Sequence, residues 1–157
     1  MPGPINNELF AKALFALLQE TFEKVEGVYL DRGTSLFETI DSLTYQQASH
    51  ALVDGGSTIA GHVYHIRFYL QVIRDYMRGQ WAENLDWKQS WVVKRVDNKE
   101  WVALRQKLRE EYAGLTEYLK EFTDWSEERR LGGSMAIIAH TAFHIGAIRQ
   151  LVLAAKE

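Results

Sequence analysis

Apolar residues recur along much of this chain at steps of three and four, the spacing of one face of an α-helix. The first such stretch predicts a helix from Asn6 or Asn7 to about Val25. Its core-facing side consists of Phe10, Leu14, Leu17, Leu18, Phe22 and Val25, while Glu8, Lys12, Glu20 and Lys24 occupy the other side. Between residues 35 and 51 the composition indicates short helical segments.

A second amphipathic helix is predicted after the loop Asp54-Gly55-Gly56, with Ser57 as the residue expected to cap it. This helix runs to about Arg78 or Trp81, and Gly79 favours its end there. Its apolar stripe consists of Ile59, Val63, Ile66, Leu70, Ile73 and Met77.

Two further helices are predicted in the C-terminal half. Asp97 or Asn98 caps the first of them, whose core positions are Trp101, Leu104, Leu108, Tyr112, Leu115 and Leu119. A polar connection over residues 125–130 leads to Gly132-Gly133-Ser134, which is expected to open the last helix. Residues 135–147 carry no formal charge while their histidines are neutral, so we expect this helix to be buried on most sides.

Three tryptophans, Trp81, Trp87 and Trp91, lie in the segment between the second and third long helices. The segment is too long for a tight helix–helix turn, which predicts an ordered crossover packed by its own aromatic rings. Four long helices, one long Trp-rich crossover and no strand pattern together predict an all-α four-helix bundle. At 157 residues the chain fits a single domain over residues 1–157.

The composition excludes several classes of function. A net charge of −3 without any basic run gives no electrostatic footprint for nucleic acid. Cysteine is absent, which excludes disulfides, thiolate metal sites and cysteine nucleophiles and suits a reducing compartment. We find no secretory signal and no apolar run of the roughly 20 residues that a membrane span needs. We therefore expect a soluble cytoplasmic protein with no nucleic-acid or membrane partner.

Two histidines four residues apart, His140 and His144, lie on one face of the last predicted helix. They share a stripe with Ile137, Ile148 and Leu151, so both imidazoles point where core residues point. Burying two imidazoles without partners costs about a few kcal/mol each, unless something binds both. A divalent cation does so by accepting one neutral nitrogen from each ring. The alternative is a hydrogen bond from each ring to a carbonyl or a water.

A third ligand is expected from the second helix, which carries His62 and His65. His62 lies nearer the centre of the apolar stripe and His65 nearer its edge, beside Tyr69, so periodicity alone slightly favours His62. An isolated histidine on an apolar face is more often a hydrogen-bonded core residue than a ligand. His50 precedes the Gly-Gly loop, where a surface or capping role is expected.

Two motifs carry a resemblance to a known family. Residues 57–66, Ser-Thr-Ile-Ala-Gly-His-Val-Tyr-His-Ile, are followed at long range by residues 140–146, His-Thr-Ala-Phe-His-Ile-Gly. In their order and separation they resemble the DinB/YfiT-like metalloenzyme superfamily, over nearly the whole chain. The resemblance implies an up-down-down-up bundle with a divalent metal held by His65, His140 and His144. The position of His62 is usually apolar in that pattern, so the resemblance favours His65, and a histidine at position 62 is a departure.

The resemblance also implies what such a site does. Three imidazoles leave positions open for water or substrate, which is the coordination of a catalytic site. Imidazole ligands suit zinc, nickel, iron or copper, and zinc or nickel is expected here. Family members of known activity include metal-dependent hydrolases and transferases that use low-molecular-weight thiols. We therefore expect a small-molecule substrate, a thiol cofactor and a homodimer. A non-catalytic metal-binding or interaction bundle with a vestigial site is the alternative.

The sequence assigns no catalytic general base. No Asp or Glu lies within one helical turn of His65, His140 or His144. Glu38 and Asp41 precede the second helix among apolar neighbours, so either could approach the site, with a capping or solvated role as the alternative.

Overall fold

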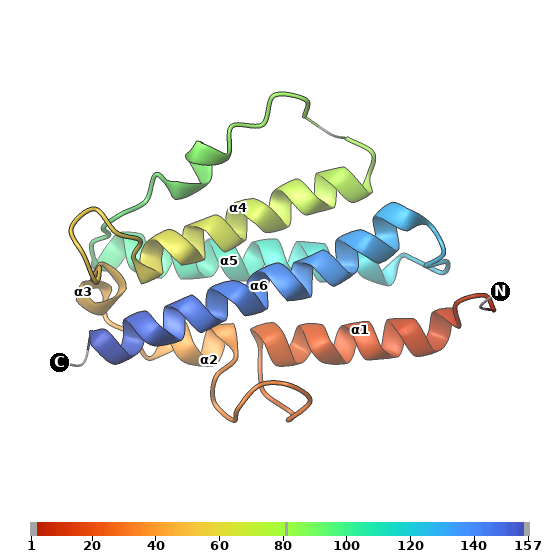
Figure 1. The fold of residues 1–157 in the computed structure, drawn as a ribbon, viewed down its shortest axis with the longest axis horizontal. Helices are drawn as coiled ribbons and strands as arrows, with labels where there is room; N and C mark the ends of the chain where they lie inside the picture. Colours follow the sequence, from red (N-terminus) through yellow and green to blue (C-terminus); the bar gives the residue numbers. More distant parts are fainter. Residues whose placement is uncertain (1–2, 81, 156–157) are drawn as a thin grey trace.

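The computed structural model describes residues 3–80 and 82–155, and within them four long helices pack side by side (Figure 1). These are α1 (Asn7–Phe22), α4 (Ile59–Met77), α5 (Asn98–Lys120) and α6 (Glu128–Ala154). The shorter elements are α2 (Leu36–Asp41), α3 (Tyr45–Ala48) and the 3₁₀-helix η1 (Trp87–Trp91). The described residues contain no strand, only a β-bridge between Ala51 and Thr58. The predicted all-α bundle is confirmed.

The crossover between α4 and α5 lies along one side of the bundle. Figure 1 shows α1 and α6 running in one direction and α4 and α5 in the other, so the chain has to return along the bundle before α5. Within η1, Trp87 packs on Phe68 of α4 with ring centroids 5.9 Å apart, and Trp91 stacks on His65 at 4.2 Å. The rings therefore dock the crossover on α4. Trp81, the third tryptophan of the predicted crossover, lies outside the described residues.

Buried apolar side chains fill the space between the long helices. The predicted stripe of α4 is half-buried at Ile73 and buried at Ile59, Val63, Ile66, Leu70 and Met77. The predicted core positions of α5 are all buried: Trp101, Leu104, Leu108, Tyr112, Leu115 and Leu119. Trp125 is also buried, although the sequence predicts a polar connection there, and its ring packs on that of Phe10. The core faces predicted for α4 and α5 are confirmed.

Side chains cap three of the long helices at or next to the predicted positions. Asn6 caps α1, and Asp97 caps α5 through a capping box. α4 is capped by Thr58 rather than by Ser57, because the Thr58 hydroxyl accepts the backbone N–H of Gly61 at 3.0 Å. The hydroxyl of Ser57 is therefore available to a side chain.

The last helix begins at Glu128, earlier than the predicted entry at Gly132-Gly133-Ser134. Its cap is Glu127, whose carboxylate accepts two backbone N–H groups of the first turn. Gly133 lies inside the helix and serves packing instead, since a Cβ there would lie 2.6 Å from the Cγ of Met77 on α4. The prediction failed because glycine suits both a helix entry and a close approach between two helices.

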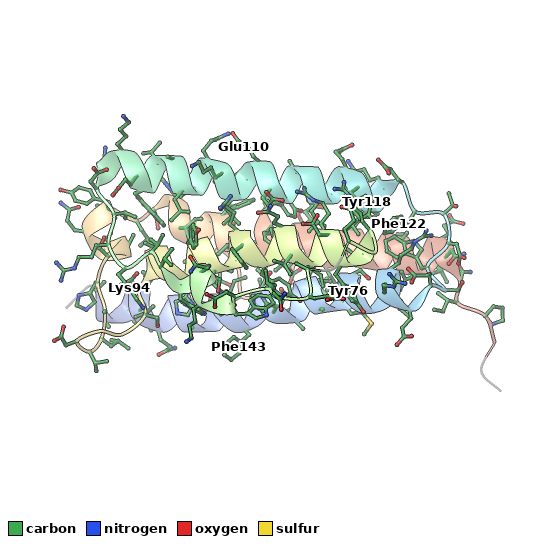
Figure 2. The ribbon with its side chains drawn as sticks, turned by 90° about the horizontal axis from the view of Figure 1, so that it is seen from above. Tyr76, Lys94, Glu110, Tyr118, Phe122 and Phe143 are labelled. Carbon is green, nitrogen blue, oxygen red and sulfur yellow. The ribbon has the colours of Figure 1, made fainter. Side chains whose placement is uncertain are left out.

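One side of α6 faces outward, contrary to the expectation that this helix is buried on most sides. Met135 and Phe143 are 59% and 73% exposed, and Figure 2 shows Phe143 projecting from α6 at the edge opposite Glu110 of α5. Among the described residues, α6 is the one helix long and apolar enough to cross a membrane. The expectation of no such segment overlooked it because polar residues interrupt the apolar run. A buried core helix passes the same test, and α6 packs on α4 and α1.

A buried carboxylate, that of Glu20, organises the loop after α1. α1 ends at Phe22, before the predicted Val25, and Glu20 has no exposed surface although periodicity placed it on the solvated side. Its oxygens accept the backbone N–H groups of Glu26, Val28, Tyr29 and Leu30 at 3.3, 2.8, 2.6 and 2.7 Å. Burial raises the pKa of this carboxyl, but the four backbone bonds outweigh it and lower the pKa to about 2.

Candidate metal centre

Three histidines meet where α4 and α6 pack on each other. His65 comes from α4, and His140 and His144 come from successive turns of α6. The Nε2 atom of His140 lies 3.1 Å from that of His65 and 3.2 Å from that of His144. Each ring offers one nitrogen to a group whose members all lie within 4.8 Å of one another. His65 and His144 are buried and His140 is half-buried.

The separations between these nitrogens suit ligands of one ion. Two nitrogens at about 2.0–2.1 Å from a shared zinc lie about 2.9 Å apart at a right angle and about 3.4 Å apart at the tetrahedral angle. The observed 3.1 and 3.2 Å fall between these limits. Hydrogen bonds satisfy the group less well, because the His140 nitrogen carries one proton or one lone pair and pairs with only one neighbour. A cation that accepts a lone pair from each ring satisfies all three.

The tautomer of His65 is fixed by the crossover. Its Nδ1 lies 2.7 Å from the hydroxyl of Ser90, a residue of η1 with no exposed surface. The same hydroxyl donates to the backbone carbonyl of Trp87 at 2.6 Å, and since a carbonyl only accepts, the hydroxyl proton points there. Ser90 therefore accepts the Nδ1 proton of His65. The Nε2 of neutral His65 presents its lone pair to the other two rings.

His62 lies outside this group, at the far edge of the His144 ring. Its Nδ1 is 2.9 Å from the Nδ1 of His144, the nitrogen that does not contact His140. Its Nε2 is 3.2 Å from the hydroxyl of Ser57. Periodicity slightly favoured His62 as the third member of the group, and the resemblance favoured His65. The structure places His65 in the group and His62 behind it.

His140 is the least satisfied of the three rings. Its Nδ1 is buried, and none of the described residues pairs with it. Tyr69 stacks on the His140 ring with centroids 3.6 Å apart, and Trp91 stacks on the His65 ring at 4.2 Å. These aromatic faces hold two of the imidazoles in their planes and limit the access of water to them. Tyr69 therefore contacts the site.

All four histidines of α4 and α6 are neutral at neutral pH. Burial, followed by repulsion from His65, lowers the pKa of His62 and of His140 to about 4. Burial, followed by repulsion from the neighbouring imidazoles, lowers the pKa of His144 to about 3, and burial also lowers the pKa of His65. A neutral imidazole carries the lone pair that a metal requires.

The two carboxylates considered as general bases have partners elsewhere. Glu38 and Ser35 form the capping box of α2, which is the capping role given as the alternative. Asp41 forms an ion pair with Arg109 of α5. Neither residue therefore supplies the candidate site with a base.

Three contributors to the site had no clear signal in the sequence. The tryptophan content predicted an ordered crossover, but nothing in it indicated that Trp91 would dock on a histidine. Ser90 and Ser57 are ordinary polar residues until the fold places each hydroxyl against an imidazole. The position of Ser57 beside a helix start favoured a capping role, which Thr58 takes instead.

A comparison with protein-family models agrees with this architecture. The model of the DinB superfamily matches residues 30–148, a span that includes α4, η1, α5 and all three histidines of the group. No significant match was found among curated proteins or among solved structures. The matched span covers most of the chain, and the chain belongs to the DinB superfamily.

Proposed function

We propose that this protein is a divalent-metal-dependent enzyme that holds its metal on His65, His140 and His144. The observation that carries the proposal is the convergence of the Nε2 atoms of the three histidines. Ser90 accepts the Nδ1 proton of His65 and so leaves a lone pair on the Nε2 atom of that ring. When bound, a divalent metal on three imidazoles supplies Lewis acidity, polarising a substrate oxygen or lowering the pKa of water or of a thiol. We propose zinc or nickel, which imidazole donors suit.

The residues around the three rings orient them and shape the access to them. Ser90 fixes the tautomer of His65, while Trp91 and Tyr69 hold the planes of His65 and His140. His140 is half-buried whereas the other two rings are buried, so His140 is the ligand nearest to solvent. The reaction that we propose is hydrolysis of a small molecule or transfer of a low-molecular-weight thiol to one. Such thiols belong to the reducing cytoplasm.

A non-catalytic metal-binding bundle is the second candidate. The engagement of Glu38 in a helix cap and of Asp41 with Arg109 favours it, because neither carboxylate is placed to move a proton at the centre. Both candidates share the metal site and differ only in turnover. Metal content and turnover therefore have to be measured separately.

Elemental analysis of the untagged full-length chain tests the metal site. We expect one zinc or nickel per chain in the wild type, and loss of metal in His65→Ala and in His144→Ala. The matched control is His50→Ala, which removes an exposed histidine outside the group and should leave metal content unchanged. A wild type that carries no metal and cannot be loaded with zinc or nickel would refute the proposed function.

A substrate screen with the loaded chain distinguishes the reactions. Candidate small molecules are incubated with and without bacillithiol, mycothiol or glutathione. Turnover that requires a thiol supports the transferase, and turnover without any thiol supports the hydrolase. Stoichiometric metal without turnover of any tested compound favours the non-catalytic bundle.

A further inference from the structure

We propose that His62 is a positioning residue for this centre: it accepts the Nδ1 proton of His144 and thereby turns the Nε2 lone pair of His144 toward the metal. The inference rests on the proposed function, since it assigns a role around the same three ligands. His62 is distinct from those ligands because it contacts His144 on the ring nitrogen remote from His140.

The contact between the two rings admits only two arrangements. The Nδ1 atoms of His62 and His144 lie 2.9 Å apart, so a single proton lies between them. If this proton were bonded to His62, neutral His144 would carry its own proton on Nε2. That nitrogen would then face His140 without a lone pair and could not bind a metal. If the proton is bonded to His144, the Nε2 of His144 carries a lone pair. Only the second arrangement is compatible with a ligand role for His144.

Ser57 completes the second arrangement on the other side of His62. Once His62 accepts at Nδ1, its own proton is on Nε2, which lies 3.2 Å from the Ser57 hydroxyl. That hydroxyl does not cap α4, because Thr58 does, and it is available to accept the proton. His144 is thus supported by His62 and then Ser57, as His65 is supported directly by Ser90. Both supporting serines belong to segments next to α4.

The His62 ring is itself held in place by its neighbours, as a residue that positions the His144 ring must be. It is 6% exposed, and Trp91 meets it edge-on with ring centroids 5.2 Å apart. Its hydrogen-bonding capacity is used at both nitrogens, by His144 and by Ser57. A side chain of similar size without an acceptor would fill the space but leave the Nδ1 proton of His144 unpaired.

The test is the zinc affinity of the full-length chain, measured by competition with a chromophoric chelator. His62→Leu removes the acceptor, while His62→Asn keeps an amide oxygen near the place of Nδ1, and His50→Ala is the remote control. We expect His62→Leu to retain one zinc per chain but to bind it about 10- to 100-fold more weakly, the usual effect of losing an outer partner of a histidine ligand. His62→Asn should restore most of the affinity, and His50→Ala should match the wild type.

A second measurement does not depend on how well the variants fold. Long-range ¹H–¹⁵N spectra of the zinc-loaded wild type report the tautomer of each histidine, and we expect a proton on Nδ1 of His144 and on Nε2 of His62. A bare Nδ1 on His144 would overturn the inference.

Several affinity results would also overturn the inference, and they differ in what they say of the metal site. Unchanged affinity in His62→Leu, or an equal loss in His62→Leu and His62→Asn, would show that the acceptor has no role. Loss of the zinc from a folded His62→Leu chain would make His62 a ligand. These results leave zinc binding by the wild type intact, whereas a wild type that binds no zinc refutes the proposed function as well.

Discussion

Replacing Ser90 by alanine removes the hydroxyl that accepts the Nδ1 proton of His65. The hydroxyl is fully buried and lies 2.7 Å from this nitrogen, so few other groups can take its place. In the variant, His65 either keeps an unpaired buried N–H or moves its proton to Nε2. The first outcome reduces stability, and the second blocks the nitrogen that faces His140 and His144. We therefore expect Ser90→Ala to affect both the fold and the metal.

The size of the two effects follows from the contacts. A buried N–H without a partner costs about 1–3 kcal/mol, so the free energy of unfolding of the metal-free variant should be lower by about that amount. Losing the outer partner of a histidine ligand weakens metal binding by about 10- to 100-fold, or about 1.4–2.7 kcal/mol. Both effects stem from one hydroxyl. Ser90→Thr, which keeps a hydroxyl, should lose less stability and less metal affinity than Ser90→Ala.

Urea unfolding of the metal-free chain and zinc competition with a chelator measure the two effects. Ser42→Ala is the matched control, because it removes an exposed serine hydroxyl bonded to the carbonyl of Thr39 and should change neither quantity appreciably. If Ser90→Ala bound zinc as tightly as the wild type, the hydroxyl would not fix the tautomer of His65. The argument that this ring is prepared as a ligand would then fail.

Three further predictions concern stability. Glu20→Gln places an amide NH₂ against backbone donors and should lower the free energy of unfolding by about 2–4 kcal/mol at pH 7. Because the pKa of Glu20 falls from an ordinary 4.5 to about 2 on folding, this contribution is full above pH 4.5 and is lost toward pH 2, where the urea midpoints of variant and wild type should converge. Gly61→Ala would place a Cβ 2.9 Å from the carbonyl oxygen of Val93. This clash with the backbone should outweigh the gain in helix propensity and lower the free energy of unfolding, measured in urea, by about 1–2 kcal/mol. A variant as stable as the wild type would contradict the close packing. The pKa values of His140 and His144 fall from an ordinary 6.5 to about 4 and about 3 on folding, so metal-free stability should be full above pH 6.5 and decline toward pH 4 as the unfolded chain takes up protons first. A double leucine variant at these positions should show a smaller decline, since the lowered pKa values of His62 and His65 still contribute to it. Equal slopes of urea midpoint against pH in the two proteins would contradict this expectation.

The helices could be predicted from the sequence because each carries one periodic apolar face. The predicted apolar faces point into the core, both in α4 from Ile59 to Met77 and in α5 from Trp101 to Leu119. Helix ends were less predictable, since one residue type serves several purposes. Gly133 is the clearest case: it suggested a helix entry, but it is a contact point with Met77.

The three-histidine group was foreseen only in part from residue spacing. The four-residue spacing of His140 and His144 placed both on one face, but periodicity on α4 slightly favoured His62 over His65. The rotation of α4 about its axis relative to α6 decides whether His62 or His65 joins the group. The apolar pattern of α4 alone does not determine this rotation. The family resemblance pointed to His65, and His65 is the one of the two that lies in the group; its role as a metal ligand stays a prediction. The support from Ser90 comes from a crossover whose docking no local pattern encodes.

X-ray absorption spectroscopy of the zinc-loaded full-length chain tests the central claim most directly, because it counts the imidazoles around the metal. We predict one zinc per chain with three imidazole nitrogens at about 2.0–2.1 Å and the remaining positions filled by oxygen donors. His65→Ala should reduce the imidazole count or abolish binding. A zinc without imidazole ligands, or a chain that binds no stoichiometric zinc, would contradict the account.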